Sequence, residues 1–286
     1  METKVNRLEE VDLLLKDFVS LIMLDYNGII EELKYITRDV GEYMRKEIDY
    51  VKKDQIEEKE LNSLVSYVDK TAEEMLVKEL QRLVPEAGFI TEENTIATED
   101  KEMMWILDPL DGTTNYLFGI PHYSTSIALS VQGEVKLGMV RDNAKKECFY
   151  AIEGQGAYKD VRLLNLTTDL KMNNAIFVTG FPYRNTFDSE GYFKVLDYCL
   201  RNSRGVRRLG SAALDLCYVA SGRISCYYES FLNIWDIAAG QLIVKEAGGK
   251  VSDFKGDNSH LNSGQIVAAN CGIYDEILKV LKNNIA

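Results

Sequence analysis

One stretch of the sequence decides both the fold and the site, and it reads Trp105-Ile106-Leu107-Asp108-Pro109-Leu110-Asp111-Gly112-Thr113-Thr114-Asn115. The apolar run at residues 103–107 that leads into it predicts a buried strand. Asp108 then lies at the C-terminal end of that strand, and α/β folds usually bind their ligands at this edge of a sheet. The sequence therefore predicts a functional carboxylate at position 108.

The residues after Asp108 favour a tight turn. Pro109 fixes φ and removes an N–H group, and Gly112 permits a positive φ or a close approach of backbone. The chain can then bring the carboxylates of Asp108 and Asp111 together and turn the Leu110 carbonyl inward. Gly112 and the two threonines behind it are expected to begin a helix, whose free N–H groups suit a phosphate.

Three other interpretations of this stretch were weighed. An EF-hand calcium loop needs a glutamate eleven residues after Asp108, and that position is Gly119. The aspartyl-phosphate phosphatases place two aspartates two positions apart, whereas Asp108 and Asp111 are three apart. An ordinary turn rich in Asp, Pro and Gly is disfavoured by the buried strand before the stretch and by the threonines after it.

Several other acidic residues lie at the ends of expected strands or helices. Glu92 and Glu93 follow the expected strand 88–91, where a solvated turn is the simplest explanation. Asp69 begins the expected helix 66–83, where an acid complements the helix dipole. Asp236 begins the expected helix 234–247, where it could act as a cap. Each of these acids is weak evidence by itself.

Together, these acids suit the hydrolysis of a phosphate monoester. Two hard cations about 4 Å apart can clamp the attacking and leaving oxygens of a phosphoryl group. Mg²⁺ prefers carboxylate and water ligands, so such a site needs several Asp or Glu residues at strand ends and loops. An all-oxygen site also needs neither Cys nor His.

Composition sets limits on the class of protein. The chain has 286 residues, of which 46% are apolar and 27% charged, so it is neither disordered nor fibrous. With roughly 150 residues per domain we expect about two domains or one large α/β unit. The 33 basic and 45 acidic residues give a net charge of −12, which argues against broad electrostatic binding of nucleic acid. A phosphorylated small molecule is not excluded, because a bound cation can reverse the local field.

The cysteines and the N-terminus predict a cytoplasmic protein. The five cysteines are an odd number without a CxxC pair, which indicates buried thiols in a reducing compartment. The two histidines, His122 and His260, are too far apart for a His-rich metal centre. Residues 1–17 lack the apolar core of a signal peptide, and no apolar run of about 18 residues predicts a membrane span.

The chain divides into two expected α/β parts. One or two amphipathic helices are expected within residues 1–50, which Gly28 and Gly41 could interrupt, and the charged run 52–60 is expected to be a solvated loop. Antiparallel strands are expected at 124–131, 135–141, 147–151, 154–158 and 162–164. The second half alternates strands (175–179, 207–209, 224–229, 250–252, 266–269) with helices (189–201, 211–220, 234–247, 273–281). We place the boundary near 170–180, with parts 1–175 and 176–286.

Taken together, these segments resemble the inositol monophosphatase family of Mg²⁺-dependent, lithium-sensitive phosphatases. The resemblance covers about Ser63 to Ala269 and rests on five segments: residues 64–69, 89–93, 108–115, 210–213 and 235–240. The family's fold is a layered αβαβα sandwich of the α/β (α+β) class, and its members are usually homodimers. The Asp-Gly-Thr-Thr-Asn sequence favours the inositol branch over the branch that acts on nucleotide 3′,5′-bisphosphates.

The resemblance implies a role for each matching residue. The metal ligands would be Glu92, Asp108, the Leu110 carbonyl, Asp111 and Asp236. Thr113, together with Glu92, would orient and deprotonate the attacking water, and Asp69 would hold Thr113. The substrate-binding residues would be Glu92, Leu110, Asp111, Gly112, Thr113, Gly210, Ser211, Ala212, Glu229 and Asp236. Lys59 is the candidate for the family's loop lysine, and the loop around Tyr183-Arg184 would also meet the alcohol.

The expected reaction is hydrolysis of myo-inositol 1-phosphate by two or three Mg²⁺ ions. Alternatives within the family are fructose 1,6-bisphosphate, histidinol phosphate and adenosine 3′,5′-bisphosphate. A non-catalytic metal- or phosphate-binding regulator would have lost one of the acids or Thr113, and all are present. The expected partners are therefore a small phosphorylated polyol or sugar and a second copy of the chain, with no nucleic acid and no membrane. The basic cluster 201–208 is interpreted as a surface loop in preference to a dimer contact or a funnel for acidic substrates.

Overall fold

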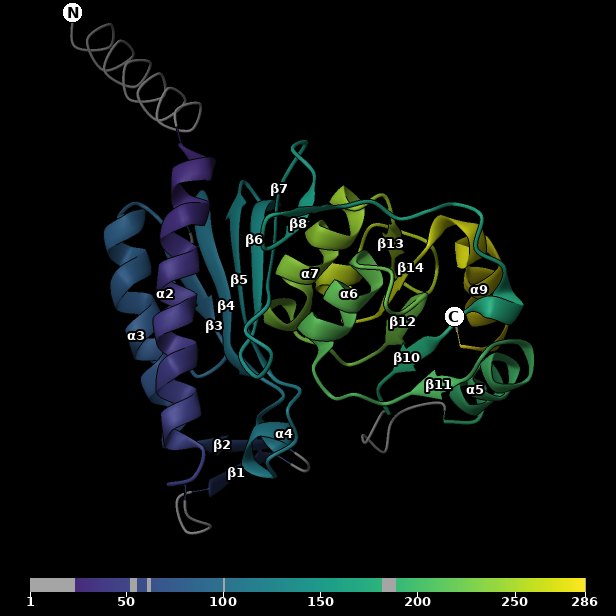
Figure 1. Cartoon of the computed structure of the whole chain (residues 1–286), viewed down its shortest axis with the longest axis horizontal. Helices are drawn as coiled ribbons and strands as arrows, with labels where there is room; N and C mark the ends of the chain where they lie inside the picture. Colours follow the sequence, from purple (N-terminus) through teal and green to yellow (C-terminus); the bar gives the residue numbers. More distant parts are fainter. Residues whose placement is uncertain (1–23, 52–55, 61–62, 100, 182–188, 286) are drawn as a thin grey trace, which may run out of the picture.

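The structure is a computed structural model that describes residues 24–51, 56–60, 63–99, 101–181 and 189–285. Its helices and sheets stack in αβαβα order, as Figure 1 shows. The outer helices α2 (Tyr26–Glu47) and α3 (Tyr67–Leu83) cover one face of a 7-stranded sheet. A 5-stranded sheet lies beyond the middle helices, and α5 (Ser189–Asn202) and α9 (Cys271–Asn284) cover its far face. The expected layered sandwich is confirmed.

The 7-stranded sheet has its strands in sequence order. Its strands are β3 (Gly88–Thr91), β4 (Met103–Asp111), β5 (Ser124–Val131), β6 (Glu134–Asp142), β7 (Cys148–Ile152), β8 (Ala157–Lys159) and β9 (Arg162–Leu164). The pair β3 and β4 is parallel and every other pair is antiparallel. The carboxyl ends of β3 and β4 therefore meet at one edge of the sheet.

The 5-stranded sheet has the order β11 (Val206–Arg207), β10 (Phe177–Thr179), β12 (Cys226–Glu229), β14 (Ile266–Ala269), β13 (Lys250–Ser252). Its first three strands are parallel, and β14 is antiparallel to both of its neighbours. The two large sheets divide at the loop that precedes β10, close to the expected boundary. The division into parts 1–175 and 176–286 stays a prediction, because helices from the second part pack against the first sheet.

Those middle helices are α6 (Ala212–Ala220) and α7 (Ile234–Glu246). Every residue of α6 is buried, as are residues 237–244 of α7. A helix that is apolar on all sides is stable when both faces are covered. Here one core joins the two helices to Ala128 and Val140 of the first sheet and to Tyr227 and Ile266 of the second.

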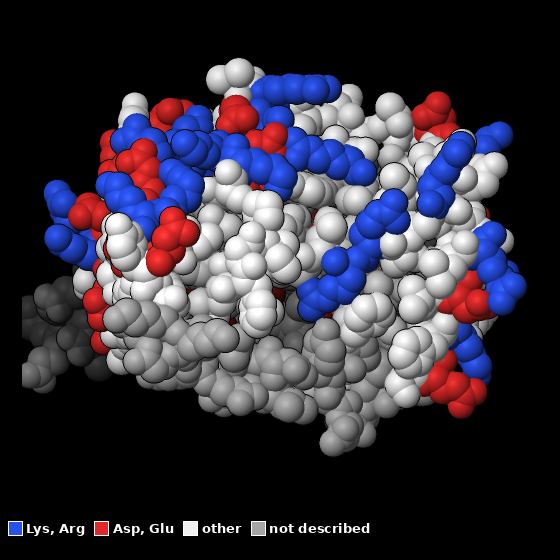
Figure 2. Space-filling view, turned by 60° about the horizontal axis from the view of Figure 1, so that its bottom comes forward, with Lys and Arg blue, Asp and Glu red and all other residues white. Residues whose placement is uncertain are grey.

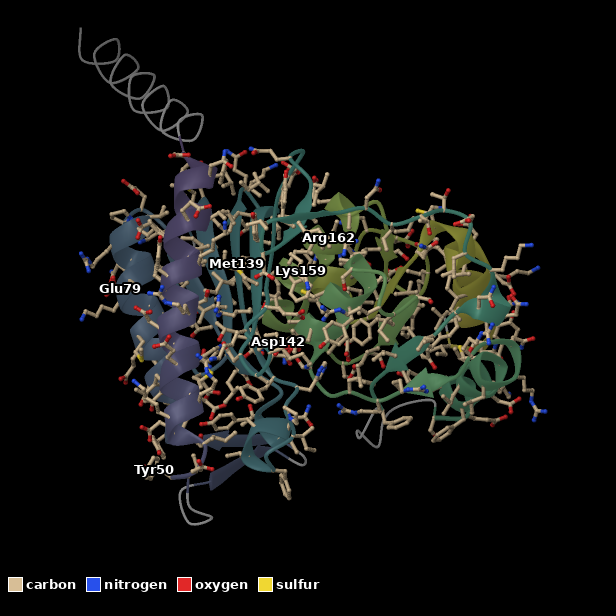
Figure 3. The ribbon with its side chains drawn as sticks, in the orientation of Figure 1. Tyr50, Glu79, Met139, Asp142, Lys159 and Arg162 are labelled. Atoms are coloured by element: carbon tan, nitrogen blue, oxygen red, sulfur yellow. The ribbon has the colours of Figure 1, made fainter. Side chains whose placement is uncertain are left out.

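The outer helix α2 is continuous, so the expectation that Gly28 and Gly41 could interrupt it is wrong. Its buried residues face the sheet, and Thr37 Oγ1 lies 3.7 Å from the sulfur of Met139 on β6. Figure 3 labels Met139 beside this helix. Tertiary packing of an amphipathic face outweighs the weak helix propensity of two glycines. The apolar residues at 13–22 lie outside the described part of the chain.

Two further expectations need correction. Residues 56–60 of the charged run form strand β1 (Ile56–Glu60), paired antiparallel with β2 (Ser63–Ser66), because backbone hydrogen bonds form whatever the side chains are. The strand expected at 103–107 continues to Asp111, past Pro109, with an irregular register between Asp108 and Asp111. A proline is tolerated in a strand at such a bulge. The short helices α4 (Thr113–Leu117, where a helix start was expected) and α8 (His260–Ser263) and the 3₁₀ turn Met172–Asn174 complete the described elements.

All five cysteines are free thiols, and all but Cys271 are buried. Within the described ranges, no helix is both long enough and apolar enough to cross a membrane.

Candidate active site

Acidic residues from β3 and β4 meet at one edge of the 7-stranded sheet. The parallel register pairs Thr91 with Leu107, so Glu92 and Asp108 lie next to each other just beyond it. Asp108 is 1% exposed, and its Oδ1 accepts a hydrogen bond from the Leu110 N–H at 2.9 Å. This bond folds the bulge back over the strand end and so places Asp111 on the same edge.

Helix α7 brings a fourth carboxylate to the same edge. Ser126, which lies opposite Asp108 on β5, donates a hydrogen bond to the Trp235 carbonyl at 3.2 Å. The next residue is Asp236, whose Oδ2 accepts a hydrogen bond from the Asn233 N–H at 2.6 Å. Asp236 is therefore a helix cap, as its position in the sequence predicted, and it also belongs to the acid cluster.

Burial and the neighbouring charges raise the pKa values of the three aspartates in the cluster. Burial raises the pKa of Asp108 well above its usual range, and the charges of Glu92, Asp111 and Asp236 raise it further. Burial also raises the pKa of Asp236 well above its usual range, and the charges of Asp111 and Glu92 raise it further. Carboxylates that destabilise one another's charged forms in this way are frequent at functional sites.

The residue types at this edge fit a hard divalent cation. Carboxylate oxygens and a backbone carbonyl are the ligands that Mg²⁺ and Ca²⁺ prefer. Within the described ranges, no group of three or more His, Cys, Asp or Glu side chains is already positioned to hold an ion. Like charges repel when no cation lies between them, so the fit rests on the donor set and its shared location. A cation at this place would relieve the repulsion that raises the pKa values.

Asp111 also joins the sheet to helix α6. Its Oδ2 accepts hydrogen bonds from Ser211 Oγ at 2.6 Å and from the Ala213 N–H at 2.8 Å. Its Oδ1 accepts a weaker bond from the Ala212 N–H at 3.3 Å. The resemblance to the family implied that Ser211 and Ala212 lie around the substrate. In the structure both contact the Asp111 carboxylate and hold its orientation.

Thr113 and Asp69 meet although they lie far apart in the sequence. Thr113 Oγ1 is 3.0 Å from Asp69 Oδ1 and 3.0 Å from the Leu110 carbonyl oxygen, so its single hydroxyl proton has two possible acceptors. Asp69 Oδ2 accepts hydrogen bonds from the Ser66 N–H at 2.8 Å and from Ser66 Oγ at 2.7 Å, which completes a capping box at the start of α3. Burial raises the pKa of Asp69 above its usual value.

Gly112 connects β4 to α4 in a conformation that requires glycine. Its φ is +93°, and a Cβ there would lie 3.1 Å from the carbonyl oxygens of Gly210 and His122. Asn115, one turn later, donates hydrogen bonds to the carbonyls of His122 at 2.7 Å and Leu209 at 2.8 Å. Asn115 belongs to the sequence motif, but no role was predicted for it. In the structure its side chain holds the loop 209–210 beside Gly112.

Glu229, at the end of β12, lies on the side of the site formed by the second sheet. It accepts a hydrogen bond from the Tyr227 hydroxyl at 2.8 Å and packs directly on the backbone of Gly180, where no side chain would fit. Burial raises the pKa of Glu229 to about 7, although the Tyr227 hydroxyl and Arg208 lower it. The loop around residues 183 and 184 and the side chain of Lys59 lie outside the described part of the chain.

Sequence reasoning missed Glu73. This buried residue of α3 accepts hydrogen bonds from the backbone N–H groups of Glu93 and Thr95, each at 2.8 Å, and from the Thr95 hydroxyl at 2.8 Å. It therefore holds the loop that carries Glu92. The signal was available: Glu73 lies on the same helical face as Asp69 and the buried Leu76, where an acid is unexpected.

The chain is similar to known proteins over most of its length. The family described as the inositol monophosphatase family matches residues 27–286. A Nus factor SuhB from Pasteurella multocida is 41% identical over 225 residues, which cover 78% of this chain and 84% of that protein. An inositol-1-monophosphatase from Mesorhizobium japonicum is 38% identical over 252 residues, which cover 88% of this chain and 92% of that protein.

Solved structures agree with the fold. The crystal structure of the extragenic suppressor protein suhB from Bartonella henselae superposes with a TM-score of 0.85 at 35% identity. It covers 90% of this chain, and the match includes 100% of that structure.

The expectation about partners is wrong. It named a small phosphorylated molecule and a second copy as the only partners and excluded nucleic acid, yet the relative that is 41% identical is named a Nus factor. The net charge of −12 was a poor guide because it averages over the whole surface. The face in Figure 2 carries Lys and Arg side chains in several groups.

Proposed function

This chain belongs to the inositol monophosphatase family, and from that premise we propose that it is a Mg²⁺-dependent phosphatase that hydrolyses a small phosphate monoester, myo-inositol 1-phosphate first among them. The acid cluster at the ends of β3, β4 and the start of α7 is the observation that carries the proposal. Members of this family are generally metal-dependent. The choice of Mg²⁺ rests on the all-oxygen donor set.

Each residue of the cluster has a proposed place. Cations would be held by Glu92, Asp108, the Leu110 carbonyl, Asp111 and Asp236. Bound Mg²⁺ supplies charge neutralisation at the phosphoryl group and makes water more acidic. Gly112 and Thr113 offer backbone N–H groups at the start of α4, where a phosphate is favoured.

We assign to Thr113, together with Glu92, the task of orienting and deprotonating the attacking water. The Thr113 hydroxyl donates to Asp69 Oδ1, which leaves its oxygen lone pairs to accept a hydrogen bond from the water. Asp69 is held by both groups of Ser66, so one of the two acceptors of the Thr113 hydroxyl is in place before the substrate binds. Such fixed geometry lowers the cost of reaching the transition state.

The alcohol part of the substrate is assigned to Glu229. Its carboxylate lies between Tyr227 and the backbone of Gly180, and it can accept hydrogen bonds from the hydroxyl groups of a polyol. A buried group that hydrogen-bonds a substrate hydroxyl disfavours a substrate that lacks it, because the buried group is then left unpaired. A substrate without a hydroxyl at this place is therefore expected to react more slowly.

The test is phosphate release from four compounds: myo-inositol 1-phosphate, fructose 1,6-bisphosphate, histidinol phosphate and adenosine 3′,5′-bisphosphate. We expect the inositol ester to give the largest kcat/KM with Mg²⁺, and added Li⁺ to reduce its release. Preference for another compound would change the proposed substrate and leave the proposed metal site standing. Absence of release from all four would contradict the phosphatase proposal.

A second candidate function is a role in transcription, which the relative named Nus factor SuhB favours. We expect a tagged chain to copurify with transcribing RNA polymerase from its host, and the Asp111→Asn variant to copurify equally well, because the residue is buried in the site. Failure of both proteins to copurify would contradict this role.

A further inference from the structure

A second cavity of about 490 Å³ lies outside the acid cluster, between one side of the 7-stranded sheet and helices α7 and α8. None of the four clustered carboxylates lines it. Its walls include apolar side chains from both sides: Ile90, Ile106, Val135, Leu242 and Leu261. The volume falls within the range of small-molecule sites. The apolar side chains share the lining with polar ones, among them Gln241, Lys245 and His260.

One polar group in the wall lacks a partner. His260 is 1% exposed, and its Nδ1 has no hydrogen-bond partner among the described residues. Its Nε2 lies 3.4 Å from Oε1 of Gln241, which is also buried and also lines the cavity. A buried polar atom without a partner is costly, and native structures contain few of them. A ligand group in the cavity would give this nitrogen a partner.

The charges around the cavity favour an anion. Lys245 lines it and forms no ion pair with any described residue, and its Nζ lies 3.4 Å from Asn258 Oδ1. Burial lowers the pKa of Lys245, and burial together with the charge of Lys245 lowers the pKa of His260 to about 4. An anion between the two groups would favour their charged forms.

The acids near the cavity do not cancel this effect. Glu134 and Glu153 also line it, but both bind Lys136, at 2.5 and 2.8 Å. Lys101, a further basic residue of the lining, pairs with Glu99 at 3.2 Å. Among the described side chains of the lining, Lys245 is therefore the cation that forms no ion pair, although the charge of Glu153 acts on it and raises its pKa.

We propose that this cavity binds a small carboxylate with an apolar body, with the carboxylate between Lys245 and His260 and the body against Ile106 and Leu242. A carboxylate suits the site better than a phosphate, because the lining offers one cation that forms no ion pair and a phosphate carries more negative charge. This site goes beyond the proposed phosphatase function and does not depend on it.

The test is isothermal titration of the full chain with benzoate, and with benzamide as the uncharged match. We expect saturable binding of benzoate and about tenfold weaker binding of benzamide, the effect of one charge-assisted contact. Lys245→Gln is expected to weaken benzoate binding about tenfold. Lys78→Gln, which changes an exposed lysine on α3 far from the lining, is expected to leave binding unchanged.

Lys245 is chosen because much of the side chain is exposed and only its amine reaches the partly buried lining, so the variant is expected to fold whether or not the site exists. His260→Asn is the second variant, and circular dichroism will show whether this buried substitution keeps the fold. Benzoate binding that fails to saturate would overturn the proposal. Equal affinity of the wild type and Lys245→Gln would also overturn it, because benzoate would then bind elsewhere.

Discussion

Asp111→Asn is expected to abolish phosphate release, with a loss of about a thousandfold or more in kcat, which corresponds to roughly 4 kcal/mol in the barrier. Asparagine keeps the shape and one acceptor oxygen but loses the negative charge. The remaining oxygen can still accept the hydrogen bond from Ser211 or from the Ala213 N–H, so α6 keeps a cap. The effect therefore falls on cation binding more than on folding.

The measurement is steady-state phosphate release over a range of Mg²⁺ concentrations, with thermal unfolding of the same samples. Asp39→Asn is the matched control, because it makes the same chemical change at an exposed position on α2. Near-normal turnover of Asp111→Asn at ordinary Mg²⁺ would remove Asp111 from the ligand set. Loss of the folded state would instead show that its bonds to α6 are its main role.

Thr113→Val is expected to lower kcat by about a hundredfold to a thousandfold, within the range of general acid–base and positioning effects. Valine has nearly the same shape but no hydroxyl, so it can neither hold the attacking water nor donate to Asp69. KM is expected to change little, because in the proposed site backbone N–H groups and cations would hold the substrate's phosphate. Asp69 keeps its two bonds from Ser66, which limits the cost in stability.

Thr113→Ser is the matched variant, since it restores the hydroxyl without the methyl group. We expect serine to recover most of the rate that valine loses. If serine were as slow as valine, packing of the threonine methyl would explain the effect and the proposed proton role would fail.

The sequence predicted the parts of the site that depend on local pattern. The run before Asp108 is apolar enough to be a buried strand, and Gly112 is placed where a positive φ is needed. The resemblance to the family also paired Thr113 with Asp69, and the structure places these side chains 3.0 Å apart. Local spacing and turn chemistry predict the strand and the turn directly, whereas the pairing of Thr113 with Asp69 was implied only by the resemblance.

The sequence could not show contacts that only the packed layers create. The bonds from α6 to Asp111 join residues about a hundred positions apart, and no local pattern marks them. Glu73 looked like one more acid on a helix until its loop partners were seen. Strand β1 is highly charged, so the strand propensity of its residues is low. Its extended structure follows from its pairing with β2.

The most direct test of the account is Mg²⁺ dependence of phosphate release from myo-inositol 1-phosphate by the unmodified chain. The account predicts no release in EDTA and full recovery when excess Mg²⁺ is added. It also predicts that Asp236→Asn, at the start of α7, needs more Mg²⁺ for half-maximal release. Undiminished release in EDTA would contradict the claim that the cluster of Glu92, Asp108, Asp111 and Asp236 works by holding cations.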